Sequence, residues 1–329
     1  MKTFDHFNAR TVDEAVRLLK TYGGKARVNA GGTDLLGILK DRVLLEYPEA
    51  IVNIKTIAGL DYIIEDSQGL RIGALATLAG VANSPIIREE YKVLAEAAVA
   101  VASPQIRNMA TIGGNLCQDV RCWYYRYPNQ IGGRINCLRK GNGPCLAVSG
   151  DNRYHTILNG KKCFAVCPSD TAVALAALDA DLAIVGPSEE RRVPVKDFFE
   201  ALGNLLKPDE MVTEIRVPKP PANARQAFHK LTLRKSIDFA IVSVASVIAE
   251  ADGVCQEARI ALGAVAPMPF RATRAEALLL GKHIDARVAA EAAEAAVDGA
   301  RPLSMNGYKV QQTIVLVQRA LLGEPGIRA

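Results

Sequence analysis

ARVNAGGTDLL at residues 26–36 joins a short apolar run to a double glycine and then to the start of a helical pattern. The run from Ala26 to Ala30 is typical of a β-strand, and Gly31-Gly32 permits a tight turn. Glycines let backbone N–H groups approach a phosphate, and a helix N-terminus adds partial positive charge. The stretch therefore predicts an anion cradle, although Gly-Gly before a helix is also an ordinary turn.

A second turn of the same form lies at residues 110–116, ATIGGNL. Two such turns would hold both phosphates of a dinucleotide. Neither turn reads G-x-G-x-x-G, and the chain contains no G-x-x-x-x-G-K-[ST] motif. A Rossmann site and a P-loop nucleotidase are therefore disfavoured.

Length and composition describe a folded protein of moderate size. The chain has 329 residues, of which 49% are hydrophobic and 23% charged, so disordered and fibrous classes are excluded. At ~150 residues per domain, about two domains are expected. The net charge of +5 is too small to indicate nucleic acid or a membrane surface. We find no pattern of a membrane span or a signal peptide, and expect a cytoplasmic protein.

Periodicity around the first turn predicts mixed α and β structure. Residues 11–21 suit an amphipathic helix, with Thr11 as N-cap and Glu14 completing a capping box. The same reasoning predicts strands at 50–54 and 70–74, a helix capped by Thr77, a helix over 87–102, and a helix followed by a strand over 171–186.

The proline-rich run at residues 217–221, VPKPP, is typical of a linker. We therefore predict one domain over 1–221 and a second over 222–329. The second reads as three strands followed by three helices, an α+β arrangement. These elements are expected at 225–234, 239–250 and 257–265, then near 273–281, 285–299 and 308–322.

Six of the seven cysteines lie between Cys117 and Cys167, around a segment, 118–165, that lacks apolar periodicity. This segment is long for a structureless loop, so a metal is expected to order it. Four cysteines follow the spacing C-x14-C-x7-C-x17-C. Their thiolates suit a 4Fe-4S cluster and a structural zinc ion about equally, although paired C-x2-C knuckles are missing.

Four separated motifs resemble the FAD-binding medium subunit of the molybdenum hydroxylases, the xanthine dehydrogenase and carbon monoxide dehydrogenase family. They are AGGTDLL at 30–36, SPQIRNMATIGGNLCQD at 103–119, CPSDTAVAL at 167–175 and LGAVAPMPFRATRAEALLLG at 262–281. The resemblance covers nearly the whole chain. It implies an α+β fold, with an FAD-binding domain of the vanillyl-alcohol-oxidase (PCMH) type followed by a small α+β domain of three antiparallel strands and helices.

Carried onto this sequence, the resemblance implies FAD contacts at both glycine turns and at three later positions. Lys230 is either a positive charge near the flavin, which would stabilise an anionic reduced ring, or a solvated surface lysine. The implied residues are Asn29, Ala30, Gly31, Gly32, Thr33, Asp34, Leu35, Thr111, Gly113, Gly114, Asn115, Asp170, Val212 and Lys230.

The cysteine-rich segment is similar to the insert of the 4-hydroxybenzoyl-CoA reductase FAD subunit, which carries a 4Fe-4S cluster. The resemblance implies the ligands Cys122, Cys137, Cys145 and Cys163, with Cys167 as the alternative to Cys163. Cys117 belongs to the motif on the FAD side. The spacing within this insert differs from that of the reductase.

The implied function is that of an oxidoreductase subunit that transfers electrons. It would pass them between ferredoxin or NAD, the 4Fe-4S cluster, FAD and the 2Fe-2S clusters of a small partner subunit. A large molybdopterin subunit would complete a heterotrimer, doubled by symmetry. No catalytic residue stands out in this chain. The alternatives are a self-contained flavin oxidase or dehydrogenase, and a zinc-stabilised scaffold that lacks FAD.

Overall fold

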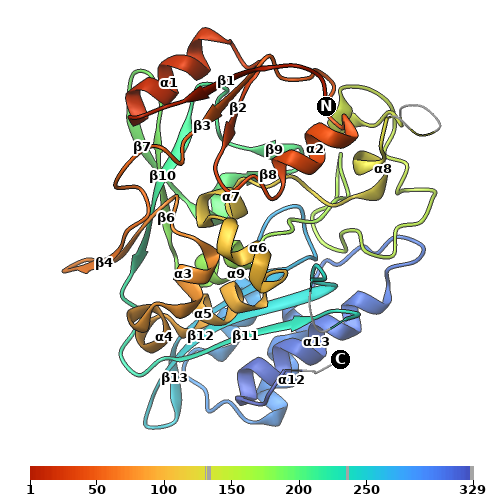
Figure 1. The fold of residues 1–329 in the computed structure, drawn as a ribbon. Helices are drawn as coiled ribbons and strands as arrows, with labels where there is room; N and C mark the ends of the chain where they lie inside the picture. Colours follow the sequence, from red (N-terminus) through yellow and green to blue (C-terminus); the bar gives the residue numbers. More distant parts are fainter. Residues whose placement is uncertain (130, 132–134, 235–236, 327–329) are drawn as a thin grey trace.

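A computed structural model of the chain describes residues 1–129, 131, 135–234 and 237–326. The N-terminal part is a parallel sheet of order β1-β3-β2, made of β1 (Asp5–Asn8), β3 (Ala50–Asn53) and β2 (Ala26–Asn29). It is accompanied by α1 (Val12–Thr21) and α2 (Leu35–Asp41) (Figure 1). Thr11 caps α1 as predicted, since Glu14 N donates to its Oγ1 at 3.1 Å. The Glu14 carboxylate accepts from Arg10 N instead of Thr11 N, so the capping box is only half formed.

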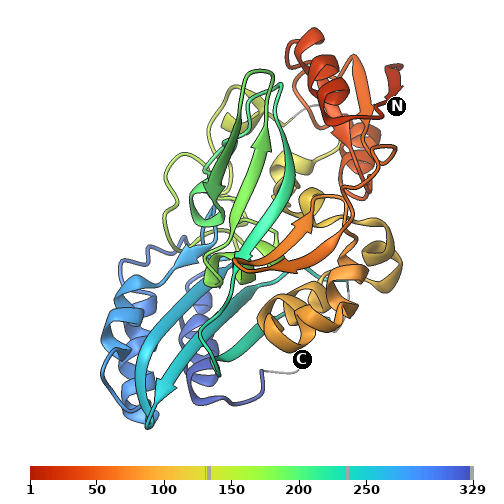
Figure 2. The same ribbon diagram turned by 90° about the vertical axis from the view of Figure 1, so that its left-hand side faces the viewer.

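The central sheet has the order β4-β5-β10-β6-β7, and its neighbouring strands are antiparallel where they pair. In Figure 2 it stands between the N-terminal sheet and the C-terminal domain. The strands are β4 (Ile63–Asp66), β5 (Gly69–Gly73), β10 (Met211–Pro218), β6 (Asp181–Val185) and β7 (Glu190–Pro194). The predicted linker at 217–221 therefore begins inside β10, where Val217 is buried.

Several short helices connect the sheets. They are α3 (Leu78–Asn83), α4 (Pro85–Glu90), α5 (Lys92–Ala100), α6 (Pro104–Met109), α7 (Ile112–Leu116), α9 (Asp170–Ala177) and α10 (Val195–Phe198), the last leading into the hairpin β8 (Phe199–Glu200) and β9 (Gly203–Asn204). The single helix predicted over 87–102 is wrong, because the chain breaks at Tyr91 into α4 and α5. Tyr91 is fully buried, so an apolar pattern runs through the break without revealing it.

The C-terminal domain confirms the predicted order of strands and helices. Its antiparallel sheet runs β11 (Arg225–Leu231), β12 (Val242–Ala251), β13 (Val254–Gly263) and β14 (Phe270–Arg271). The last strand was not predicted, because two residues are too few to show an alternating pattern. The helices α11 (Thr273–Leu279), α12 (Ala286–Ala296) and α13 (Tyr308–Leu322) follow. One hydrophobic core extends from Leu94 and Val173 to Ala245 in β12, so the two predicted domains pack together.

The cysteine-rich insert has little regular structure beyond α8 (Trp123–Arg126) and the 3₁₀ turn η1 (Leu138–Lys140). Residues 130 and 132–134 of the insert lie outside the described part. The end of the insert is held by the C-terminal domain, where Ile157 and Leu158 join the hydrophobic core. Among the helices that the structure describes, none combines the length and the apolar character needed to cross a membrane.

Candidate functional site

Both glycine turns line one cavity of about 630 Å³, which we call the large cavity. This volume lies within the usual range for small-molecule and cofactor sites. A narrow cavity of about 70 Å³ shares Thr33, Asp34 and Gly114 with it. The large cavity contains the predicted residues Asn29, Ala30, Gly31, Gly32, Thr33, Asp34, Leu35, Thr111, Gly113, Gly114 and Val212, and the narrow cavity contains Asn115, Asp170 and Lys230. The structure thus brings all fourteen predicted cofactor residues together.

The two turns touch through backbone atoms. A Cβ atom placed on Gly31 would lie 2.1 Å from the Met109 carbonyl oxygen, just before the second turn. Only glycine permits this approach. Gly32 has a φ of +71°, the left-handed region that glycine adopts at little cost. The predicted turn is therefore confirmed, and Gly31 is required by packing and Gly32 by backbone conformation.

The second turn is the start of the short helix α7. Thr111 caps it, since Gly114 N donates to Thr111 Oγ1 at 3.1 Å. The Asn115 side chain is fixed from the other side: its Oδ1 accepts from Ser169 Oγ and Thr171 Oγ1, each at 2.6 Å. The turn at 111–115 is thereby joined to the start of α9, which carries Asp170.

Lys230 is a buried, paired cation and not a solvated surface lysine. Its Nζ donates to Asp170 Oδ2 at 2.7 Å and to the Ala100 carbonyl at 2.8 Å. The Lys230 and Asp170 side chains are only 8% and 7% exposed. Burial raises the pKa of Asp170, and the charge of Lys230 opposes that rise. The charge that Lys230 brings to the narrow cavity is therefore largely neutralised by its partner.

The four predicted cysteine ligands line one small cavity, which we call the cysteine cavity. Burial raises the pKa of the Cys122 thiol to about 11, and His155 Nε2 lies 3.3 Å from its sulfur. Within the described ranges, no three His, Cys, Asp or Glu side chains are grouped so that they could hold a metal ion. The lining residues include Cys122, Cys137, Cys145 and Cys163, together with Tyr124, Tyr125 and Arg139.

The other two cysteines between residues 117 and 167 line the large cavity and not the cysteine cavity. Cys117 and Cys167 line the large cavity beside the second glycine turn. Burial raises the pKa of both thiols to about 12, so both are protonated at neutral pH. Cys163, unlike Cys167, shares a cavity with the other three predicted ligands.

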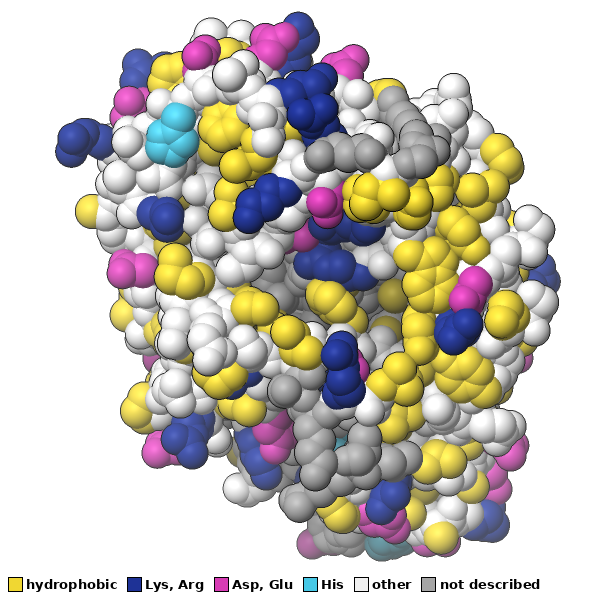
Figure 3. Space-filling model, turned by 45° about the vertical axis from the view of Figure 1, so that its right-hand side comes forward, with side chains coloured by type: hydrophobic (Ala, Val, Ile, Leu, Met, Phe, Trp, Pro, Cys, Tyr) yellow, Lys and Arg dark blue, Asp and Glu magenta, His cyan; other side chains and the backbone are white. Residues whose placement is uncertain are grey.

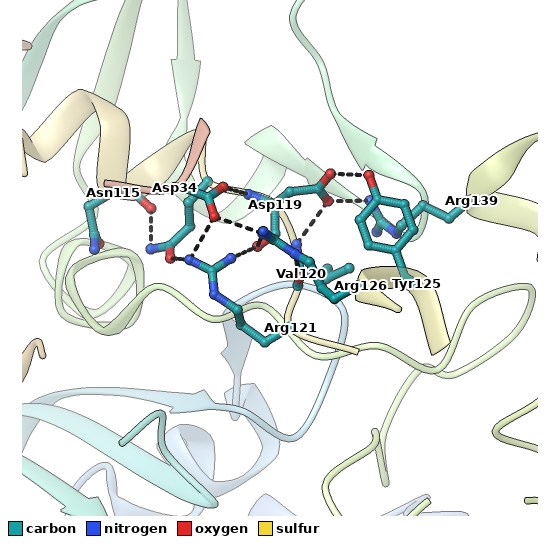
Figure 4. Close-up of polar contacts among 9 residues, drawn as sticks. Asp34, Asn115, Asp119, Val120, Arg121, Tyr125, Arg126 and Arg139 are labelled. Atoms are coloured by element: carbon teal, nitrogen blue, oxygen red, sulfur yellow. Dashed lines mark hydrogen bonds and ion pairs between the residues drawn. The ribbon is translucent and has the colours of Figure 1, made fainter. Parts of the chain in front are cut away.

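A charged network that the sequence analysis did not anticipate connects the insert with the first glycine turn (Figure 4). Asp34, at the start of α2, accepts from Arg121 at 2.9 Å and from Arg126 at 2.8 Å. Its second carboxylate oxygen accepts from Asp119 N at 2.9 Å. Because Asp34 serves these partners, it makes no side-chain cap to α2. Arg121, Arg126 and Arg139 all lie within residues 118–165, but the sequence does not indicate which residues they pair with.

Asp119 extends this network toward the cysteine cavity. Its carboxylate accepts from the Tyr125 hydroxyl and, at 3.2 Å, from Arg139 Nη1. The Arg139 fork also donates to the carbonyls of Ala201, at 2.9 Å, and Leu202, at 3.2 Å, in the β8–β9 turn. In the space-filling view, Lys or Arg side chains are visible in the depth of a hollow near the middle of the face (Figure 3).

Two family models match the chain, one for each predicted part. The model described as "FAD binding domain in molybdopterin dehydrogenase" matches residues 2–220. The model described as "CO dehydrogenase flavoprotein C-terminal domain" matches residues 226–323. The two matches together account for most of the chain.

Similar proteins and similar solved structures indicate the same family as the two family models. The chain is 36% identical over 288 residues to the aldehyde oxidoreductase FAD-binding subunit PaoB of Escherichia coli (strain K12), covering 85% of this chain and 86% of that protein. It is 31% identical to the nicotinate dehydrogenase FAD-subunit of Eubacterium barkeri, over 85% and 81% of the two chains. A chain of carbon monoxide dehydrogenase from Hydrogenophaga pseudoflava matches with a TM-score of 0.78 at 30% identity, covering 98% of this chain and 96% of that one. With its two glycine turns on one cavity, this chain belongs to the FAD-binding medium subunits of the molybdenum hydroxylase family.

Proposed function

We propose that this chain transfers electrons between FAD and a 4Fe-4S cluster held by its own cysteine-rich insert, as a subunit of a molybdopterin-dependent dehydrogenase or reductase. One observation carries the proposal: the cysteine cavity and the large cavity share two wall residues, Tyr125 and Arg139. Two redox groups in these cavities would be separated by little more than one layer of side chains.

The large cavity has a volume of about 630 Å³ and polar groups that suit FAD. The two glycine turns would hold the pyrophosphate through backbone N–H groups, and the narrow cavity with Lys230 and Asp170 continues from them. Asn29 Oδ1 is buried without a hydrogen-bond partner among the described residues, and it lines the cavity as an acceptor for a ligand donor. FAD supplies the exchange between two-electron and one-electron chemistry.

The cysteine cavity supplies four thiols and few other polar groups. Burial disfavours a free Cys122 thiolate, whereas a bound metal deprotonates a coordinating thiol outright. Cys163 is the proposed fourth ligand because it lines this cavity, while Cys167 lines the large one. The likeness of the insert to that of 4-hydroxybenzoyl-CoA reductase remains a prediction.

We further propose that the substrate site lies on other chains. One partner would be a small subunit with 2Fe-2S clusters and the other a large molybdopterin subunit, arranged as a dimer of heterotrimers. Ferredoxin or NAD would be the external carrier. Related proteins carry names such as "medium chain" and "FAD-subunit", which supports an assembly of several chains. Co-purification of two further chains from the native source is expected, and turnover of a substrate by the isolated chain would instead favour the self-contained flavin enzyme.

Iron analysis of the full chain tests the cluster. After anaerobic purification we expect four iron and four sulfide per chain, and a paramagnetic resonance signal upon reduction. Cys137→Ser and Cys145→Ser should each lose that signal. Cys255→Ser is the matched control, because Cys255 is buried in β13 and lines neither cavity. Zinc in place of iron, or an intact cluster in both variants, would overturn the assignment.

A further inference from the structure

The cysteine-rich insert contributes side chains to the wall of the large cavity. The two glycine turns that also line this cavity lie outside the insert. Tyr125 lies in α8, three residues after Cys122, and Arg139 lies in η1, two residues after Cys137. Both line the large cavity as well as the cysteine cavity. The insert that would hold the proposed cluster therefore also forms part of the wall of the large cavity.

Both residues bind Asp119, which connects them to the first glycine turn. The Tyr125 hydroxyl and the Arg139 guanidinium meet on the Asp119 carboxylate, and Asp119 N donates to Asp34 Oδ2 at 2.9 Å. Asp34 directly follows the glycines and Thr33. A movement of the segments around Cys122 and Cys137 would therefore be transmitted from Tyr125 or Arg139 to Asp119, and from Asp119 to Asp34 in the first glycine turn (Figure 4).

Arg139 also contacts the β8–β9 turn, which contributes to the wall of the large cavity. Its donors to Ala201 and Leu202 fix the β8–β9 turn, and Leu202 lines that cavity. Arg139 Nε is buried without a hydrogen-bond partner among the residues described, so one donor of the guanidinium remains available to a ligand. The side chain is only 9% exposed, and the Tyr125 ring lies 5.7 Å from its guanidinium carbon.

We infer that the insert completes the FAD site through Tyr125 and Arg139, so that the cluster and FAD bind cooperatively. This rests on the proposed cluster. Ligation of Cys122 and Cys137 fixes the segments that carry Tyr125 and Arg139, and the fixed wall raises the affinity for FAD. Because coupling between two binding sites is reciprocal, bound FAD must stabilise the cluster by the same factor.

The test compares FAD affinity with and without the cluster. Full-length protein is freed of flavin, divided into cluster-loaded and chelator-stripped samples, and titrated with FAD by flavin fluorescence. We expect stripping to weaken FAD binding by about tenfold, within the usual range of coupling between sites. In Arg139→Ala and Tyr125→Phe the loaded protein should lose this advantage, so the ratio of the two dissociation constants falls toward one.

The control and the reverse measurement keep the inference falsifiable. Arg153→Ala removes an arginine of the same insert whose side chain is 51% exposed, pairs with Asp151 and lines neither the large cavity nor the cysteine cavity, so it should leave the ratio unchanged. In the reverse direction, saturating FAD should protect the cluster of intact protein against a chelator. Equal FAD affinity with and without the cluster would overturn the coupling alone. A chain that binds no iron would overturn the proposed cluster and the coupling together.

Discussion

Gly31 is the residue at which the two glycine turns touch. In Gly31→Ala the new Cβ would meet the Met109 carbonyl at 2.1 Å and Ala110 Cα at 2.9 Å, both backbone atoms that yield little. We expect a loss of about 1–3 kcal/mol in the free energy of unfolding, as for an overpacked core. The flavin content of the purified protein should fall as well, because the two turns are pushed apart.

Gly37 offers a matched control in the helix that follows the same turn. It is exposed in α2, and an added Cβ would meet nothing within 4 Å. Gly37→Ala should therefore stabilise the protein by about 0.5–1 kcal/mol through helix propensity, with unchanged flavin content. Urea unfolding and flavin absorbance of the two variants check both effects, and equal behaviour of the pair would contradict the backbone contact.

The buried Lys230–Asp170 pair predicts a pH-dependent variant. Lys230→Met leaves the Asp170 carboxylate buried without its cation, at a cost of about 3–5 kcal/mol near neutral pH. The pKa of Asp170, already raised by burial, rises further in the variant. Between the unfolded and folded pKa values the folded state binds more protons, so stability falls as pH increases. The destabilisation measured by urea unfolding should therefore be smaller at pH 5 than at pH 8.

The double variant Asp170→Asn with Lys230→Met provides the comparison for that experiment. It removes the titrating carboxylate, so the difference between pH 5 and pH 8 relative to the original protein should disappear. A pH difference that persists in the double variant would assign the effect to another group.

Among the elements, α13 and the loop before it hold the end of the insert. Asn306 Nδ2 donates to the carbonyls of His155 and Thr156, each at 3.0 Å. Lys309 Nζ donates to the carbonyls of His155, at 3.0 Å, and Ala264, at 2.5 Å. Asn306 and Lys309 are fully buried. The C-terminal domain therefore anchors a segment that starts in the FAD-binding part of the chain.

Asn306→Ala should loosen this anchor. The Thr156 carbonyl loses its Asn306 donor, at an expected cost of about 1–3 kcal/mol, whereas the His155 carbonyl keeps its bond from Lys309. The iron content should fall because Cys163 follows this segment. Arg287→Ala is the control, since it removes only an exposed i,i+4 ion pair on α12. Thermal unfolding and iron analysis measure the outcome. Iron content that is the same in Asn306→Ala and in the control would show that the anchor does not support the cluster site.

For the whole molecule, the volume of the large cavity and its two glycine turns predict FAD as the bound flavin. FMN has a single phosphate and would leave one turn without a partner. Flavin released by acid from the purified chain should therefore run as FAD on chromatography. Recovery of FMN alone would contradict the use of both turns.

The sequence by itself determined the elements that depend on local pattern. The two glycine turns, the strand before the first of them, and the order of strands and helices in the C-terminal domain were predictable, because apolar periodicity and glycine requirements are properties of adjacent residues. The family resemblance likewise indicated Cys122, Cys137 and Cys145 as ligands, but it left Cys163 and Cys167 as alternatives, and these two line different cavities in the structure.

Only the tertiary structure decided which distant side chains meet. Asp34 binds Arg126, which lies 92 residues away in the sequence. Lys230 binds Asp170, which lies 60 residues away. The wall formed by Tyr125 and Arg139 likewise depends on how an irregular insert packs against two other parts of the chain. Ion pairs between distant residues, and cavity walls built from distant segments, produce no periodic pattern in the sequence. They depend on which loops come close together, and this is decided by the packing of the whole molecule.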